Sequence, residues 1–103
     1  MIQIPGYAKK SVVVLGLGLS GLAAARAMME SDADVWAWDD NANARAEAEA
    51  VGIPVRDPES ANWRTMSALI MSPGIPHTHP NPHPIAKRAK DARCPIIGDM
   101  ELL

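Results

Sequence analysis

The amino-acid sequence predicts an α/β fold in which helices cover both faces of a five-stranded parallel sheet. Short apolar segments rich in β-branched residues alternate with helical segments along the 103 residues. A glycine-rich turn joins the first apolar segment to the first helical one. Short buried strands that are joined by helices are typical of parallel sheets, because parallel neighbours need a long crossover connection.

Composition and charge exclude several classes of protein. The chain has 10 Lys and Arg against 12 Asp and Glu, a formal net charge of −2, so it lacks the basic surface of a nucleic-acid-binding protein. No segment approaches the roughly 20 apolar residues that span a bilayer, and we expect no membrane partner. The single cysteine excludes a disulfide framework and favours a reducing, cytoplasmic location.

The first half of the chain contains two strand–helix units. Ser11–Leu15 and Asp34–Trp38 are short apolar runs that predict buried strands. Between them, Leu19–Glu30 is rich in alanine and places its larger apolar residues on one face of a helix. Residues 42–51 predict a second helix, which Gly52 ends.

The second half continues the alternation in shorter elements. We expect strands at residues 53–55, 67–71 and 95–97, and helices at residues 58–64 and 84–92. A further helix begins after Asp99, which is a good N-cap residue. We therefore expect residues 1–98 to form the domain and residues 99–103 to start a connection to a further domain.

Residues 16–21 read GLGLSG and match the pattern G-x-G-x-x-G between a strand and a helix. In this pattern Gly16 permits a tight turn, Gly18 lets a phosphate approach the backbone, and Gly21 lets the helix pack closely on the strand. Exposed N–H groups and the positive end of the helix dipole favour an anion. The motif predicts a Rossmann-like, three-layer fold with a phosphate site. The alternative is a turn that only packs the helix.

Asp39 ends the second strand at close to the spacing expected for the acidic residue of a dinucleotide-binding fold. A carboxylate there can accept hydrogen bonds from a ribose diol, as in NAD-binding proteins. It can equally accept from the N3–H of uracil, because an ionised carboxylate only accepts. These residues alone leave NAD and a uridine nucleotide as alternatives.

Four segments together resemble the N-terminal domain of a Mur ligase: GLGLSG at 16–21, WDD at 38–40, SPGI at 72–75 and GDMEL at 98–102. The last two are more specific than the glycine motif, and NAD binding does not require them. The runner-up interpretation is an NAD(P)-binding domain of an oxidoreductase or a nucleotide-sensing regulator. A module that keeps the turn only as a scaffold is a third.

The resemblance implies a cytoplasmic enzyme of peptidoglycan synthesis with three domains. Such enzymes activate the carboxylate of UDP-N-acetylmuramoyl-L-alanine with ATP and Mg²⁺, and the amine of D-glutamate then attacks the acyl phosphate. This chain contains no G-x-x-x-x-G-K-[ST] phosphate loop. We therefore expect it to bind the UDP moiety, to bind no cofactor itself, and to catalyse no ligation alone.

The resemblance assigns seven residues to the UDP site, namely Gly18, Leu19, Ser20, Asp39, Asp40, Asn41 and Gly74. It implies that the first three donate hydrogen bonds to the diphosphate and that Asp39 accepts from uracil N3–H. Asp40 and Asn41 would flank the ring, and Gly74 would line the path of the diphosphate and sugar. Some members carry a hydroxyl residue and then an arginine where this chain has Asp40 and Asn41, so no stacking arginine is implied.

Other conspicuous residues have structural interpretations. His77, His79 and His83 lie in a proline-rich loop without cysteine, and we expect a solvated loop there and no metal site. Trp36 and Trp38 share one face of their strand because side chains alternate, and we expect them to pack in the core, with Trp38 beside the nucleotide base as the alternative. Trp63 is expected to cover the core, and Cys94 to be an inert thiol.

Overall fold

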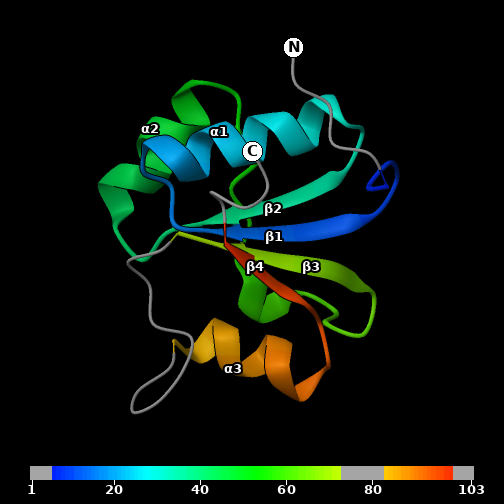
Figure 1. The fold of residues 1–103 in the computed structure, drawn as a ribbon. Coiled ribbons are helices and arrows are strands. Elements are labelled where there is room, and N and C mark those ends of the chain that lie inside the picture. Colours follow the sequence, from blue (N-terminus) through cyan, green and yellow to red (C-terminus); the bar gives the residue numbers. More distant parts are fainter. Residues whose placement is uncertain (1–5, 73–82, 99–103) are drawn as a thin grey trace.

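Short apolar runs and alanine-rich helices build the fold (Figure 1), and the computed structural model describes residues 6–72 and 83–98 of it. The elements are β1 (Ser11–Leu15), α1 (Leu19–Glu30), β2 (Asp34–Trp38), α2 (Ala42–Ala50), the 3₁₀ helix η1 (Pro58–Ser60), β3 (Met66–Met71), α3 (Pro84–Asp91) and β4 (Ile96–Gly98). The expected bounds of the first two strands and the first helix are confirmed.

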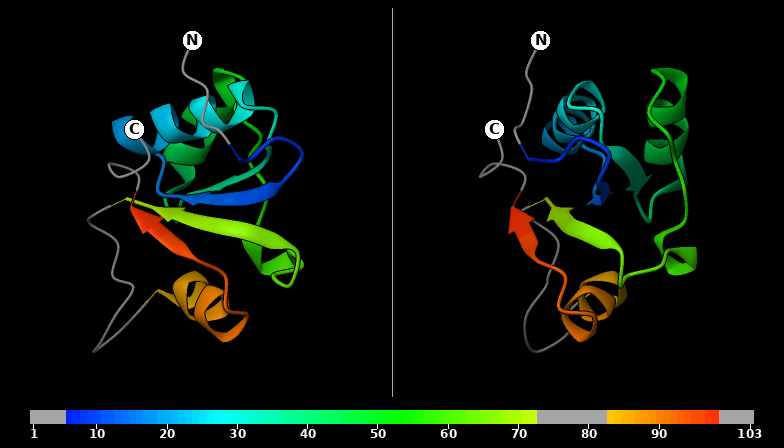
Figure 2. Two further views of the ribbon diagram at one scale, coloured as in Figure 1. Left: turned by 45° about the vertical axis from the view of Figure 1, so that its right-hand side comes forward. Right: turned by 90° about the vertical axis from the view of Figure 1, so that its right-hand side faces the viewer.

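The strands form one parallel sheet in the order β2-β1-β3-β4. Two helices, α1 and α2, lie on one side of the sheet, whereas α3 lies on the other (Figure 2). In this order the connection from β1 leads to β2 at one edge of the sheet, whereas the connection from β3 leads to β4 at the opposite edge. The carboxyl ends of β1 and β3 therefore form a topological switch point, where open α/β sheets bind their ligands.

The expectation of five strands is wrong for the described residues, which contain four. Residues 53–55 form only one isolated parallel bridge, between Val55 and Ala37 of β2. Pro54 accepts a hydrogen bond from the Ala37 N–H but has no N–H of its own to extend a ladder. The segment is therefore tied to the edge of the sheet at one point and does not become a strand.

The expected helix at residues 58–64 is also shorter in the structure. Only Pro58–Ser60 is helical, as a single 3₁₀ turn. Ala61 then returns to an extended conformation, and Trp63 turns inward to donate its indole N–H to the Pro58 carbonyl at 3.0 Å. Burial of this large side chain, which is 7% exposed, therefore ends the helix early.

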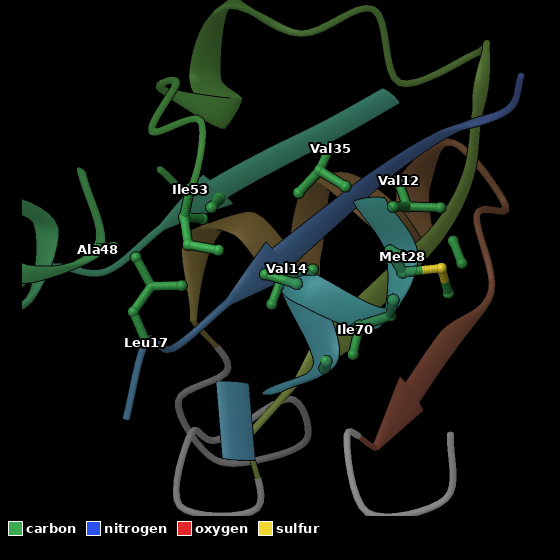
Figure 3. Packing of buried hydrophobic residues seen from close by; sticks show 12 residues of the cluster. Val12, Val14, Leu17, Met28, Val35, Ala48, Ile53 and Ile70 are labelled. Atoms are coloured by element: carbon green, nitrogen blue, oxygen red, sulfur yellow. The ribbon is translucent and has the colours of Figure 1, made fainter. Parts of the chain in front are cut away.

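The core lies on both faces of the sheet. Val12 and Val14 of β1 face α1 and α2, whereas Val13 and Leu15 face α3. Figure 3 shows the first cluster, in which Met28 of α1 packs with Val12, Val14 and other strand residues. Each of these side chains is fully buried, and burial of one such residue stabilises a fold by about 1.5–3 kcal/mol.

Trp36 and Trp38 both pack against the second cluster, on the α3 side, as the alternation predicts. Both are partly exposed, and each is covered by an arginine. The Cζ atom of Arg56 lies 4.1 Å from the Trp36 ring centre, and that of Arg45 lies 4.5 Å from the Trp38 ring centre. The Trp38 ring is therefore used in packing within the protein.

Candidate functional site

A cavity of about 350 Å³ lies at the carboxyl ends of β1, β2 and β3. It is lined by residues of the glycine turn, the ends of the three strands and the start of α1: Leu15, Gly16, Gly18, Ser20, Asp39, Asp40 and Ser72. This is the switch point of the sheet. Four of the seven residues that the sequence analysis assigned to a nucleotide line it, namely Gly18, Ser20, Asp39 and Asp40.

Two glycines of the turn are required by the protein itself. Gly16 has a φ of +96°, a conformation that residues with a Cβ rarely adopt. A methyl group on Gly21 would overlap the carbonyl oxygen of Gly16, so α1 can approach the end of β1 only with glycine there. The roles predicted for these two positions are confirmed by the geometry.

Gly18 is required by neither conformation nor packing. Its φ is −73°, which any residue can adopt, and a Cβ there would meet no atom within 4 Å. Gly18 is the N-cap of α1 and has no side chain to accept from the N–H groups of the first turn, which lack partners within a helix. The missing side chain therefore leaves space in front of those groups.

The two neighbouring residues of the turn differ in exposure. Leu19 is 91% exposed, although it is a large apolar residue at the start of α1. Ser20 is partly buried and lines the cavity, as Gly18 does. Leu19 does not line the cavity, so a ligand there would meet the backbone of the turn and Ser20.

Asp39 connects the glycine turn to the start of α2. Its Oδ2 accepts the backbone N–H of Leu17 at 2.8 Å, and its Oδ1 accepts that of Asn41 at 2.8 Å. Arg45 donates from Nη1 to the Asp39 carbonyl oxygen at 2.7 Å. Each carboxylate oxygen has a second lone pair, so Asp39 can still accept from a donor of the ligand.

Asn41 has a structural role that the sequence analysis did not assign to it. It is the N-cap of α2, and its Oδ1 accepts the N–H groups of Asn43 at 2.8 Å and Ala44 at 3.1 Å. A cap of this kind stabilises a helix by about 1 kcal/mol. Its side-chain oxygen thus already holds α2, and Asn41 does not line the cavity.

Ser72 lines the cavity but was not among the assigned residues, although it begins the SPGI segment. Its backbone N–H donates to the carbonyl oxygen of Leu15 at 3.2 Å, and its Oγ lies 3.5 Å from the carbonyl oxygen of Gly16. Parallel pairing of β1 and β3 places it beside the glycine turn. Gly74, the remaining assigned residue, lies outside the described residues.

His83 is the histidine of the proline-rich loop that the structure describes; His77 and His79 lie outside the described residues. Its Nδ1 accepts the Ile85 N–H at 3.1 Å and caps α3, and its Nε2 lies 2.7 Å from Asp40 Oδ2. Within residues 6–72 and 83–98, no three His, Cys, Asp or Glu side chains are grouped so that they could hold a metal ion.

The chain matches a protein-family model over residues 10–98, and that model describes the MurD-like N-terminal domain of Mur ligases. It is also similar to proteins named UDP-N-acetylmuramoylalanine–D-glutamate ligase. The identity is 48% over 100% of this chain for the protein of Paramagnetospirillum magneticum, and 46% over 99% for that of Bartonella henselae. The chain spans 22% of the length of each of these relatives.

A solved structure confirms the fold class. The chain superposes on shikimate dehydrogenase from Aquifex aeolicus with a TM-score of 0.66, and the match covers 96% of this chain and 46% of that one. The sequence identity is 18%, so this likeness establishes a shared Rossmann-like fold and nothing about the ligand. None of the helices in the described part of the chain has the length and apolar character to cross a bilayer.

Proposed function

Because the chain belongs to the family of MurD-like N-terminal domains of Mur ligases, we propose that it binds the uridine diphosphate end of UDP-N-acetylmuramoyl-L-alanine. In this proposal it is the substrate-binding domain of a ligase that adds D-glutamate to that precursor in peptidoglycan synthesis. We propose nucleotide binding for this chain. We propose the ligase reaction only for a protein as long as its relatives.

The observation that carries the proposal is the open space at Gly18. Conformation and packing explain Gly16 and Gly21, but nothing within the described protein explains glycine at position 18. A ligand that approaches the backbone closely does explain it, since a Cβ would stand between that ligand and the first N–H groups of α1. The helix dipole and those N–H groups favour a negatively charged ligand such as a diphosphate.

Uridine fits the acidic side of the cavity better than an anion does. Asp39 and Asp40 both line it, and ionised carboxylates accept hydrogen bonds only. The N3–H of uracil and the hydroxyl groups of ribose are donors. A nucleotide with its phosphates at the turn and its nucleoside over the end of β2 would therefore meet a complementary group at each end of the cavity.

The remaining steps of the proposed reaction need groups that this sequence does not contain. It has no G-x-x-x-x-G-K-[ST] loop, which holds the phosphates of ATP. We therefore assign ATP, Mg²⁺ and D-glutamate to other domains of the ligase, and we assign no cofactor to this chain. Because the proposed reaction consumes ATP and a UDP-linked precursor, we propose a cytoplasmic location for the enzyme.

Calorimetry and ligand-observed NMR on the 103-residue chain test the proposal. We expect UDP and UDP-N-acetylmuramoyl-L-alanine to bind at the same site and NAD not to displace them. Binding of NAD in preference to UDP would instead support a dinucleotide-binding domain, and binding of neither would support a scaffold. In a separate assay with ATP, D-glutamate and the precursor, the chain should release no phosphate above background.

A further inference from the structure

His83, the N-cap residue of α3, contacts Asp40, which lines the proposed nucleotide cavity. It stands at the N-terminus of that helix, 43 positions from Asp40 in the sequence, and its side chain is 14% exposed. Asp40 is 70% exposed at its side chain. A mostly buried histidine therefore holds an exposed carboxylate that would otherwise be free to rotate.

The hydrogen bonds of His83 define its tautomer. Nδ1 accepts the Ile85 N–H at 3.1 Å, so this nitrogen carries a lone pair and no hydrogen. A neutral imidazole then carries its hydrogen on Nε2, which lies 2.7 Å from Asp40 Oδ2. The neutral ring thus donates to the carboxylate and accepts from α3 at the same time.

Asp40 forms part of the wall between two cavities. One is the nucleotide cavity at the glycine turn, and the other, of about 280 Å³, lies between β2, η1 and α3. The two other carboxylates that line the second cavity have partners of their own. Asp57 accepts the Glu59 N–H at 2.9 Å, and Glu59 pairs with Arg88 at 2.9 Å, whereas Asp40 is the carboxylate that lies beside Nε2 of His83.

We propose that His83 is a positioning residue for the nucleotide site, which fixes the Asp40 carboxylate through its Nε2–H so that Asp40 presents its free oxygen to a donor group of the ligand. This inference rests on the proposed function. Fixing a carboxylate before binding removes the entropy cost of ordering it in the complex. It also keeps the charge of Asp40 from turning toward the phosphates that the glycine turn would hold.

Two substitutions separate the bond to Asp40 from the cap of α3. In His83→Asn the side-chain oxygen can replace Nδ1 as the cap, but the side chain is too short to reach Asp40. In His83→Gln the amide nitrogen extends to the position of Nε2 and can still donate to Asp40, whereas the cap is lost. The first variant removes the proposed role and the second retains it.

We expect His83→Asn to melt close to the wild-type temperature and to bind UDP roughly three- to tenfold more weakly. We expect His83→Gln to melt several degrees lower, because the cap of α3 is lost, and to bind UDP with nearly wild-type affinity. In an Asp40→Ala background, His83→Asn should have no further effect on UDP affinity. Calorimetry and thermal unfolding of the 103-residue chain measure each quantity.

The ¹⁵N shifts of the His83 ring add a readout that does not depend on a ligand. They should show a hydrogen on Nε2 and none on Nδ1. The opposite tautomer, wild-type affinity in His83→Asn, or an effect of that variant that persists without Asp40 would each overturn the inference. If the wild-type chain does not bind UDP, the proposed function is wrong. If it binds UDP with an affinity that does not depend on position 83, only the inference about His83 is wrong.

Discussion

The carboxylate of Asp39 accepts the backbone N–H of Leu17 at 2.8 Å and so ties the end of β2 to the glycine turn that follows β1. Its other oxygen accepts the N–H of Asn41 at 2.8 Å, at the start of α2. The acidic residue that the sequence analysis assigned to the ligand therefore also holds the shape of the site. This dual role affects how its substitution should be measured.

Replacement of Asp39 should lower both stability and ligand affinity. Asp39→Ala removes the acceptor of two backbone N–H groups, and a hydrogen bond to a charged group contributes about 1.5–3 kcal/mol. We expect the free energy of unfolding to fall by about 2 kcal/mol in urea titrations, and UDP affinity to fall at least tenfold in calorimetry below the melting transition. Unchanged affinity would remove Asp39 from the UDP site while leaving its structural role.

Substitution of Gly18 should mainly lower UDP affinity, whereas substitution of Gly21 should mainly lower stability. Gly18→Ala adds a methyl group to open space, so we expect a stability loss of at most about 1 kcal/mol from the poorer N-cap and a more than tenfold loss of UDP affinity. Gly21→Ala forces a methyl group onto the Gly16 carbonyl and should prevent stable folding. Circular dichroism and calorimetry distinguish these effects. Wild-type UDP binding in Gly18→Ala would contradict a phosphate at the turn.

The sequence predicts the strands and helices whose own residues decide them. Ser11–Leu15 is an almost entirely buried apolar run, Asp34–Trp38 alternates buried with partly exposed residues, and Leu19–Glu30 has an alanine-rich buried face. Residues 53–55 fail as a strand because pairing at a sheet edge depends on tertiary contacts and on N–H groups that Pro54 lacks. The local pattern of apolar residues carries no information about that edge.

The candidate site is predictable where a motif implies a backbone shape, and not where distant side chains meet. The glycine turn and the acid after β2 lie together, as the motif predicts. The contact between His83 and Asp40 joins two loops 43 residues apart, and no local pattern predicts it. Nor could the sequence reveal that Asn41 caps α2, because an Asn before a helix serves equally well as a cap or as a ligand contact.

The ion pair between Asp34 and Arg56 should stabilise the fold only at pH values where the Asp34 carboxyl group is ionised. Burial raises the pKa of Asp34, but the hydrogen bond and the charge of Arg56, together with smaller contributions, outweigh it, so the pKa lies below its ordinary value of 3.8. A carboxyl group whose pKa is lowered by folding stabilises the fold above its unfolded pKa and loses this effect as pH falls through the folded value.

Asp34→Asn should therefore be slightly less stable than the wild type at pH 7, by under about 1 kcal/mol because both side chains are partly exposed. The difference in melting temperature should shrink as pH falls below about 3.8, the ordinary value for this carboxyl. Glu47→Gln, at an exposed position of α2, serves as the control. A difference that stays constant down to acid pH would contradict a contribution from the charged pair.

Cys94 should report on opening of the fold, because it is the only cysteine and is 6% exposed in the cluster beneath α3. Burial raises the pKa of its thiol above the ordinary value of 9.0, and the thiolate is the reactive form. A disulfide reagent at pH 8 should therefore label the native chain at least 100-fold more slowly than the chain in denaturant, a factor that corresponds to roughly 2.7 kcal/mol of protection.

The labelling rate of Cys94 should also show whether a ligand in the proposed nucleotide cavity stabilises the folded chain. A ligand that binds only the folded state at 100 times its Kd stabilises that state by about 2.7 kcal/mol. If labelling requires global unfolding, saturating UDP should slow it by up to about 100-fold, whereas NAD should not. Labelling that UDP leaves unchanged, in a chain shown to bind UDP, would mean that Cys94 is exposed by local opening of α3 and β4, and the protection factor would then measure the stability of that part alone.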